Sequence, residues 1–521
     1  MSWKPEVEGI ERRRELAAEH GGDEAVEIQH SLGRLTIRER ITALADADSF
    51  REQGPIAGHS ETDDDGSLRS FTPANYVLGI AKIDDRPCVV GGEDFTQRGG
   101  SPSPAGLRKS VYAEELALRY RLPLVRFLQG GGGSVTGTAG GKQPPPGSVR
   151  GDPVYAAHRF RSIAEIMATA PVVSAAVGAV AGFPAARLAA SHFAVMTRGA
   201  QILIAGPAVV ERATGEKLSK EELGGADVHG RNGVVDQVVE DEVAAFEAIR
   251  SFLRFLPTNV YESAPRTPCS DDRNRAEEAL LSIVPRDRRK TYKIRKLLGL
   301  VLDRDSFFEL GAAYGRGQVT GLAHLNGQPV GILANDGRFY AGAMTAHGAR
   351  KVRRFVDLCE AFHLPVLSFV DEPGFMIGSE AESAATIRFG TEAMFAVVQS
   401  TMPWAAVIVR KTYGVAAAAH FAPNAHVLCW PSAEGGALPA EGGVAVAFRR
   451  EIAAAADPEA RRRELEARFA GKPSAFPRAE SFGVNDLIDP RRTRPELCDW
   501  IDWIQPLLRE HRGRKTHSLR P

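Results

Sequence analysis

Apolar and polar positions alternate in the same order in two separate stretches of the chain. In each stretch two apolar runs of strand length flank a short polar turn, Asp84-Asp85 in the first and Asn326-Gly327 in the second. Asn-Gly between alternating runs is a strong signal for a β-hairpin. Each hairpin is followed by a helical pattern, an apolar strand, a second helical pattern and a further strand. Strands that alternate with helices predict an α/β fold with parallel sheets covered by helices.

The expected bounds follow from the same pattern. The first helix of each stretch should end at Leu122 or Leu364, because each precedes a proline and helices usually stop there. Two charged segments outside the repeated stretches, 5–30 and 449–470, each predict one surface helix. The strands expected after the hairpins are residues 123–129, 170–182, 365–371 and 402–414.

The two stretches are copies of one another. Residues 105–125 align with residues 347–367, so that Lys109 corresponds to Lys351, 242 positions later. A repeat this long indicates a duplicated domain rather than a solenoid, whose periods run roughly 20–50 residues. The polar, proline-rich segment 257–275 marks the boundary between the copies. We therefore expect an N-terminal domain of residues 1–258 and a C-terminal domain of residues 259–521.

Each copy ends in a glycine that is expected to open a helix. Gly182 and Phe183 precede Pro184, and proline is favoured at the first position of a helix. In the second copy Gly414 and Val415 precede a run of alanines, the best helix formers. Backbone N–H groups at a helix start can bind an oxyanion. A single such glycine is explained by a tight turn, but two at equivalent positions favour a functional site.

Composition and charge narrow the class of protein. The 65 basic and 65 acidic residues cancel, so nothing points to nucleic acid or to an anionic membrane. The five cysteines have no CxxC spacing, which argues against a zinc site or a disulfide framework. The N-terminus is too charged for a signal peptide. The most apolar stretch, 171–196, reads as a buried strand and helix rather than a membrane span. We expect a cytoplasmic protein.

Side-chain motifs give less evidence about function than the two glycines do. The glycine-rich segment 129–148 lacks P-loop spacing and is expected to be a loop beside a ligand. No Ser-His-Asp, Cys-His or HExxH pattern is apparent. Asp371 and Glu372 are the only paired acids on an expected site loop, and for Asp371 a turn or helix cap is the simpler interpretation. Backbone donors without a nucleophile suit enolate chemistry, in which negative charge on a thioester oxygen is stabilised.

At this point the chain resembles a known family over nearly its whole length. It is similar to the carboxyltransferase (beta) subunit of biotin-dependent acyl-CoA carboxylases, the propionyl-, methylcrotonyl- and geranyl-CoA carboxylase family. Its ATGE motif, at 213–216, is most similar to the methylcrotonyl- and geranyl-CoA branch. The stretches that carry the resemblance are GRLTIRERITAL at 33–44, EDFTQRGGS at 93–101, ILIAGPAVVERATGEKLSKEELGGADVH at 202–229, FVDEPGFMIGSE at 369–380, VIVRKTYGVA at 407–416 and CWPSAE at 429–434.

The resemblance implies a fold, a reaction and an assembly. The fold is two duplicated crotonase-like (ββα-superhelix) domains, with acyl-CoA on the N-terminal side and biotin on the C-terminal side. The reaction moves CO2 from carboxybiotin to an acyl-CoA or enoyl-CoA, through an enolate held by backbone oxyanion holes. The assembly is a homo-hexamer in which the N-domain of one subunit faces the C-domain of another.

The resemblance also implies roles for individual residues. Gly182 and Phe183 would hold the thioester oxyanion, and Val415 and Ala416, after Gly414, would hold the biotin oxyanion. No metal is implied. The implied substrate-binding residues are Gly99, Gly100, Ser101, Gly131, Gly132, Ala417 and Ala418.

Biotin is expected to be carried on a partner protein, since the sequence contains no Met-Lys-Met carrier motif and no ATP-binding domain. The expected partners are therefore a biotin carboxyl carrier subunit and a biotin carboxylase. A coenzyme A thioester is the expected substrate, and neither nucleic acid nor a membrane is an expected partner.

The chain departs from the family at the site. The N-domain pair is usually Gly-Gly, but Phe183 occupies its second position. The C-domain pattern RKxYGGAYxxM is RKTYGVAAAAH here, and the usual SGGAR loop is GGGGS with Ser134. A valine with positive φ would be strained. The three alanines from Ala416 to Ala418 widen an apolar wall, which favours acyl chains longer or more branched than propionyl.

Two other functions stay open at this point. One is a biotin-independent, crotonase-like hydratase, isomerase or decarboxylase of CoA thioesters, with Asp371 or Glu372 facing the thioester. The other is a non-catalytic scaffold subunit of a carboxylase complex. The altered glycine pairs are the reason to consider it.

Overall fold

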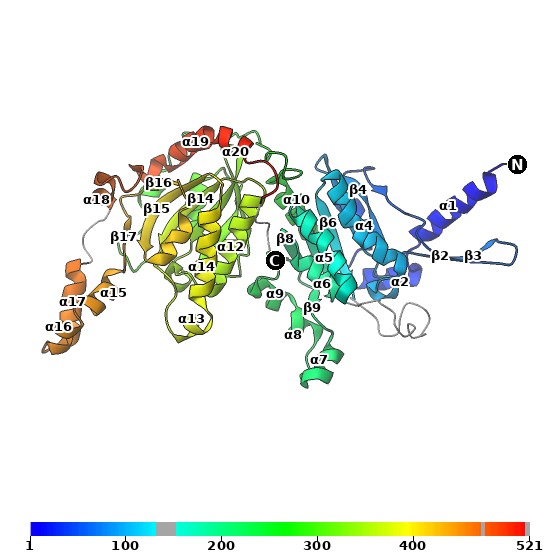
Figure 1. The fold of residues 1–521 in the computed structure, drawn as a ribbon, viewed down its shortest axis with the longest axis horizontal. Helices are drawn as coiled ribbons and strands as arrows, with labels where there is room; N and C mark the ends of the chain where they lie inside the picture. Colours follow the sequence, from blue (N-terminus) through cyan, green and yellow to red (C-terminus); the bar gives the residue numbers. More distant parts are fainter. Residues whose placement is uncertain (1, 132–152, 470–474, 516–521) are drawn as a thin grey trace. The chain divides into compact units, whose positions relative to one another are not determined.

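The chain folds into two compact units (Figure 1). The first unit ends at Glu262 and the second begins at Ser263, inside the polar segment 257–275 that the sequence marks as a boundary. The fold class is α/β, as the alternating pattern predicts. The computed structural model describes residues 2–131, 153–469 and 475–515.

The described residues of the first unit contain an eight-stranded sheet in the order β1-β4-β5-β6-β7-β8-β10, with β9 paired to β7. The pairs β1-β4 and β4-β5 are antiparallel and the later pairs are parallel. A separate hairpin joins β2 and β3. The strands are β1 (Arg51–Glu52), β2 (Gly58–Thr62), β3 (Leu68–Pro73), β4 (Tyr76–Ile83), β5 (Arg86–Glu93), β6 (Leu124–Gly130), β7 (Val172–Ala181), β8 (Phe193–Thr197), β9 (Gln201–Leu203) and β10 (Gln237–Val239). The helices are α1 (Lys4–Ala18), α2 (Asp23–Ser31), α3 (Ile37–Leu44), η1 (Arg98–Gly100), α4 (Pro104–Tyr120), α5 (Pro153–Met167), α6 (Phe183–Ala189), α7 (Pro207–Thr214), α8 (Lys220–Gly224), α9 (Ala226–Asn232) and α10 (Glu242–Arg254).

The second unit repeats this topology among its described residues, in the order β11-β12-β13-β14-β15-β16-β18 with β17 paired to β15. Figure 1 shows α12 and α14 running together along this sheet. The strands are β11 (Phe308–Leu310), β12 (Gln318–Leu325), β13 (Gln328–Asn335), β14 (Val366–Glu372), β15 (Trp404–Tyr413), β16 (His426–Cys429), β17 (Glu434–Gly436) and β18 (Asp486–Leu487). The helices are η2 (Glu278–Leu281), α11 (Ile294–Val301), η3 (Tyr340–Gly342), α12 (Ala346–Ala361), α13 (Ser379–Ser383), α14 (Thr386–Gln399), η4 (Val415–His420), α15 (Ala440–Ala447), α16 (Arg449–Ala454), α17 (Pro458–Phe469), α18 (Ala475–Glu480), η5 (Pro490–Arg492), α19 (Thr493–Trp503) and α20 (Gln505–Glu510).

The two predicted hairpins are confirmed. Each has a two-residue turn in which both residues have positive φ, the geometry that matches the twist of the flanking strands. One aspartate in each unit accepts hydrogen bonds from both turn N–H groups. Asp46 does so for the turn at Asp84-Asp85, and Asp303 for the turn at Asn326-Gly327.

Some helix bounds differ from the prediction. Segment 5–30 forms two helices, α1 and α2, and segment 449–470 contains two, α16 and α17, rather than one each. The helices before the two prolines end a little early, at Tyr120 and Ala361. Nearby residues with positive φ, Arg121 and His363, terminate them.

The apolar stretch 171–196 is confirmed as a buried strand, a short helix and a further strand, β7, α6 and β8. Within the residues that the structure describes, no helix is both long and apolar enough to cross a membrane.

The duplicated lysine has a structural role in both units. The ammonium of Lys351 is buried and donates to the backbone carbonyls of Gly311, Tyr314 and Gln318, at 2.8 to 3.0 Å. Lys109 donates to the carbonyl of Gly54 at 3.0 Å. Each lysine therefore ties the first long helix of its repeat to the loop or strand ahead of it.

Replacing Lys351 with methionine should destabilise the second unit, because it leaves buried carbonyls without a donor. An unsatisfied buried group costs about 1–3 kcal/mol. Urea unfolding would measure this loss against Lys296→Met, a matched change on the exposed face of α11. Equal unfolding free energies for the two variants would contradict this role.

Candidate active site

The glycines at 182 and 414 have the backbone conformation that their positions require. Gly182 joins β7 to α6 with φ 66° and ψ −128°, and Gly414 joins β15 to η4 with φ 64° and ψ −166°. A side chain would be strained in this region. Both expected helix starts are therefore present, one in each unit.

The departures from the family pattern carry no left-handed strain. Phe183 and Val415 are the first residues of α6 and η4, and neither has a positive φ. The positive φ falls on the preceding glycine in each case. The expected strain at Val415 is therefore absent.

One expected donor is already used. The N–H of Gly182 donates to the carbonyl of Leu203 on β9 at 3.3 Å, so it is not free as the sequence suggested. The N–H of Gly414 likewise donates to Gly436 on β17 at 3.1 Å. The donors of a helix start that lie outside its own hydrogen-bond ladder belong to its first turn. That turn begins at Phe183 in α6 and includes Val415 and Ala416 in η4.

A pocket of about 30 Å³ lies beside the first helix start. It contains two of the expected site residues, Gly100 and Phe183. This volume is close to that of one water molecule or a methyl-sized group. The pocket is lined by Asn75, Tyr76, Glu93, Gly100, Pro102, Gly106, Leu107, Ser110, Phe183, Pro184 and Arg187.

Other expected substrate residues meet at the edge of this pocket. The backbone of Gly100 packs directly against that of Gln129 and Gly130, with no room for a side chain. Gly131 donates to the carbonyl of Gly99 at 3.5 Å. The carbonyl of Ser101 accepts from the amide of Asn75, which also lines the pocket. Gly132, Ser134 and most of the expected ligand loop lie outside the described residues.

Sequence reasoning missed Glu93. Its carboxyl lines the pocket, is 6% exposed and accepts from the N–H of Gln129 at 3.3 Å. Burial raises the pKa of Glu93, and the charge of nearby Arg187 opposes that rise. Raised carboxyl pKa values occur often at functional sites. The sequence evidence that could have identified Glu93 is its place as the first residue of EDFTQRGGS.

A buried charged network holds the far end of α6. Arg126, on β6, donates to the carbonyls of Arg187 and Ala190 at 2.7 and 2.9 Å. Glu114, on α4, pairs with Arg187 at 2.8 Å and with Arg126 at 3.4 Å. A cation at a helix C-terminus is favourable, so the network fixes α6 against the sheet.

Asp371 is neither a turn nor a cap residue, and that interpretation is wrong. Asp371 and Glu372 end β14, and both are fully buried. Asp371 pairs with Arg410 at 2.8 Å and accepts the N–H of Lys411 at 3.1 Å. This carboxylate is neutralised inside the protein, so it does not face a substrate.

Glu372 is equally enclosed. Its carboxylate accepts from the amide of Asn335 and from the N–H of Gly374, each at 3.0 Å. Burial raises the pKa of Glu372, against the lowering effect of nearby His420. His420 itself contacts Ser368, which makes a Ser-His-Glu arrangement that no local spacing revealed. Ser368 and Glu372 lie on the same strand, but His420 follows Ser368 by 52 positions.

The alanines after Gly414 differ in their exposure. Ala416 and Ala417 are buried, whereas Ala418 and Val415 are exposed. Of the two alanines expected to contact substrate, only Ala418 is therefore available at the surface of η4.

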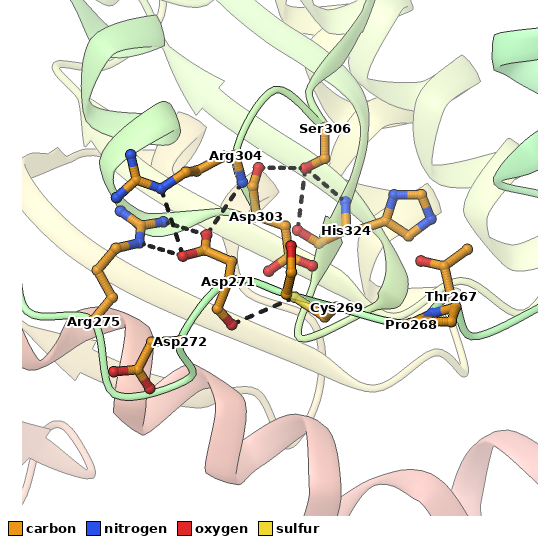
Figure 2. A pocket seen from close by; sticks show the side chains of 11 residues that line it. Thr267, Pro268, Cys269, Asp271, Asp272, Arg275, Asp303, Arg304, Ser306 and His324 are labelled. Atoms are coloured by element: carbon orange, nitrogen blue, oxygen red, sulfur yellow. Dashed lines mark hydrogen bonds and ion pairs between the residues drawn. The ribbon is translucent and has the colours of Figure 1, made fainter.

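A larger pocket, of about 470 Å³, lies elsewhere in the second unit and contains none of the expected site residues (Figure 2). Its carboxylate at Asp271 is paired with Arg275 at 2.9 Å and with Arg304 at 3.7 Å. These charges satisfy one another. Among the described residues, no group of His, Cys, Asp and Glu could hold a metal ion.

Comparisons with known proteins agree with this architecture. Residues 28–512 match the family model described as Carboxyl transferase domain. The chain is 33% identical to the methylmalonyl-CoA carboxyltransferase 12S subunit of Propionibacterium freudenreichii subsp. shermanii, covering 99% of this chain and 97% of the relative. It is 32% identical to the propionyl-CoA carboxylase carboxyltransferase subunit of Haloferax mediterranei, covering 95% of each.

A solved structure shows the same likeness in three dimensions. The transcarboxylase 12S crystal structure, a hexamer with methylmalonyl-coenzyme A bound, superimposes with a TM-score of 0.87 at 31% identity, covering 99% of this chain and 98% of that one. The duplicated fold implied by the sequence is therefore that of a carboxyltransferase. The chain belongs to the carboxyl transferase family.

Proposed function

We propose that this chain is the carboxyltransferase subunit of a biotin-dependent acyl-CoA carboxylase. The observation that carries the proposal is the pair of glycine-opened helices, one at the same place in each of two homologous units. Two similar donor sites suit two carbonyl oxygens that both gain negative charge during carboxyl transfer. The names of the relatives, which are propionyl-CoA and methylmalonyl-CoA enzymes, support this reading.

The first unit, which ends at Glu262, would hold the acyl-CoA. The N–H of Phe183, at the positive end of α6, would donate to the thioester oxygen as the enolate forms. Such preorganised donors act most strongly where charge develops in the transition state. Gly182 supplies the backbone conformation rather than the donor. The small pocket beside Phe183 would take a methyl-sized acyl substituent or an ordered water.

The second unit, which begins at Ser263, would hold biotin. Biotin supplies the activated carboxyl group, carried on its ureido ring. The ureido oxygen is an acceptor, and the residues fit it, because Gly414 and Val415 are exposed at the start of η4. The N–H groups of Val415 and Ala416 would bind that oxygen.

The assignment of acyl-CoA to one unit and biotin to the other implies partner proteins. Both relatives are named as subunits, and this chain spans at least 95% of each. We therefore propose that a biotin carboxyl carrier delivers biotin, that a biotin carboxylase loads it, and that the chain assembles as a homo-hexamer. In such an assembly the first unit of one subunit would meet the second unit of another. A cytoplasmic location stays a prediction.

The enclosed acids argue against the biotin-independent alternative. Neither Asp371 nor Glu372 reaches the surface, so neither can act on a thioester directly. The absence of strain at Phe183 and Val415 also removes the reason for a non-catalytic scaffold.

Substitution of Gly414 with alanine should slow carboxyl transfer by about 10²–10³-fold, the cost of losing one oxyanion donor. The added side chain is strained at φ 64°, so the backbone must move and carry the first-turn N–H groups with it. Steady-state rates would be compared with those of Gly66→Ala, which also has positive φ but lies in the exposed β2–β3 turn. A correctly folded Gly414→Ala protein with the rate of the wild type would disprove the second donor site.

Reconstitution tests the partner proposal. The purified chain with ATP, bicarbonate and propionyl-CoA should consume no ATP. Addition of a biotin carboxylase and a biotinylated carrier should start ATP-dependent carboxylation, measured with labelled bicarbonate. Omitting the carrier alone is the control. Carboxylation by the chain alone, or none with every partner present, would refute the proposal.

Chain-length preference should depend on Ala418. This exposed side chain would lie on one wall of the site, where each buried CH₂ of a substrate contributes about 0.8 kcal/mol. The wild type should prefer acyl chains longer or more branched than propionyl. Ala418→Ile should shift preference toward short chains by about 10–200-fold per methylene excluded. Competition among acetyl-, propionyl-, methylcrotonyl- and longer acyl-CoAs would measure it, and an unchanged order in the variant would contradict the assignment.

A further inference from the structure

Three buried polar side chains meet at the end of η4 that lies away from Gly414. Ser368 and Glu372 lie on β14, and His420 is the last residue of η4. The Ser368 hydroxyl and His420 Nδ1 are 2.8 Å apart, and His420 Nε2 lies 3.5 Å from Glu372 Oε2. Each of the three residues is 0% exposed.

The arrangement has the residue types of a hydrolytic triad but not the position of one. A nucleophile must reach its substrate, and the Ser368 hydroxyl has no access to solvent. The hydrogen bond between Ser368 and His420 Nδ1 holds the imidazole ring, whereas Nε2 faces Glu372 at 3.5 Å without a hydrogen bond. These contacts fix the position of His420 and do not activate a nucleophile.

The backbone of His420 is held as well. The indole N–H of Trp404, on β15, donates to the carbonyl of His420 at 2.8 Å. The side chain thus ties the end of η4 to β14, and the carbonyl ties the same end to β15. We refer to Ser368, Glu372, Trp404 and His420 as the η4 anchor.

The first unit supports this reading independently. Ser368 occupies the position of Arg126 in the repeat, and Arg126 binds the far-end carbonyls of α6. The two units use different side chains at the same place for the same purpose. A buried connection from this strand to the end of the short helix is therefore a common feature of both units.

We propose that His420 is a positioning residue for the second oxyanion site. The proposal rests on the proposed function, which assigns the N–H groups of Val415 and Ala416 to biotin. A six-residue 3₁₀ helix spans only about 12 Å, at roughly 2 Å per residue. Displacement at His420 is therefore passed to the donors at the other end, because the element is too short to absorb it.

The test compares His420→Leu, which fills similar space but cannot hydrogen-bond, with His420→Gln, which can still bind Ser368. Carboxyl transfer is measured from methylmalonyl-CoA to free biotin as the probe, with release of propionyl-CoA. His420→Leu should lower kcat/KM for biotin by about 10²-fold, the typical effect of a misplacement near 1 Å. KM for methylmalonyl-CoA should stay unchanged. His420→Gln should recover most of the lost rate.

A second measurement does not depend on activity. Amide hydrogen exchange of residues 414–420 should be faster in His420→Leu and close to wild type in His420→Gln. His426→Leu, on the neighbouring strand β16, is the matched control and should change neither exchange nor rate.

The outcomes separate the two proposals. Wild-type exchange and wild-type kcat/KM for biotin in His420→Leu would overturn the positioning role, as would a loss of thermal stability alone. If the wild type transfers no carboxyl group to biotin, the proposed function fails. Exchange at residues 414–420 then still decides whether His420 fixes η4.

Discussion

The geometry of the site depends on how two short helices are fixed at the ends away from their glycines. Neither α6 nor η4 is long enough to be stable through its own hydrogen bonds. Each gains its orientation from buried polar groups on the neighbouring strands, Arg126 in one unit and Ser368 in the other. A buried group that loses its partner costs about 1–3 kcal/mol, so these contacts restrict each helix to one position.

The two units share this helix geometry but have different side chains at equivalent positions of the neighbouring strands. The position of Glu93 is occupied by Asn335 in the second copy, and the position of Gly130 by Glu372. At these two repeat positions each unit therefore carries one buried carboxyl, Glu93 at the end of β5 in the first unit and Glu372 at the end of β14 in the second. In the second unit Asn335 donates directly to the carboxylate that replaced the glycine. The exchange keeps a buried acid satisfied in both units.

The altered glycine pairs illustrate how backbone donors tolerate sequence change. Only the glycine that ends the strand needs positive φ, because the next residue is already helical. Phenylalanine or valine at that next position changes the surface beside the donor and not the donor itself. The ring of Phe183 packs edge-on against Phe160 and lies over the guanidinium of Arg187. The side chains that line the site can thus change, because the donors that stabilise negative charge belong to the backbone.

The sequence alone determined the duplication, the α/β order, both hairpins and both helix starts. These features depend on local patterns, namely the spacing of apolar runs, turn residues and a glycine before helix formers. Tertiary structure decided which polar groups are satisfied. Gly182 N–H is used by Leu203, Asp371 is neutralised by Arg410, and Ser368 meets His420. Such contacts join residues that are 21 to 52 positions apart, brought together only when parallel strands pair, and no local pattern records that pairing.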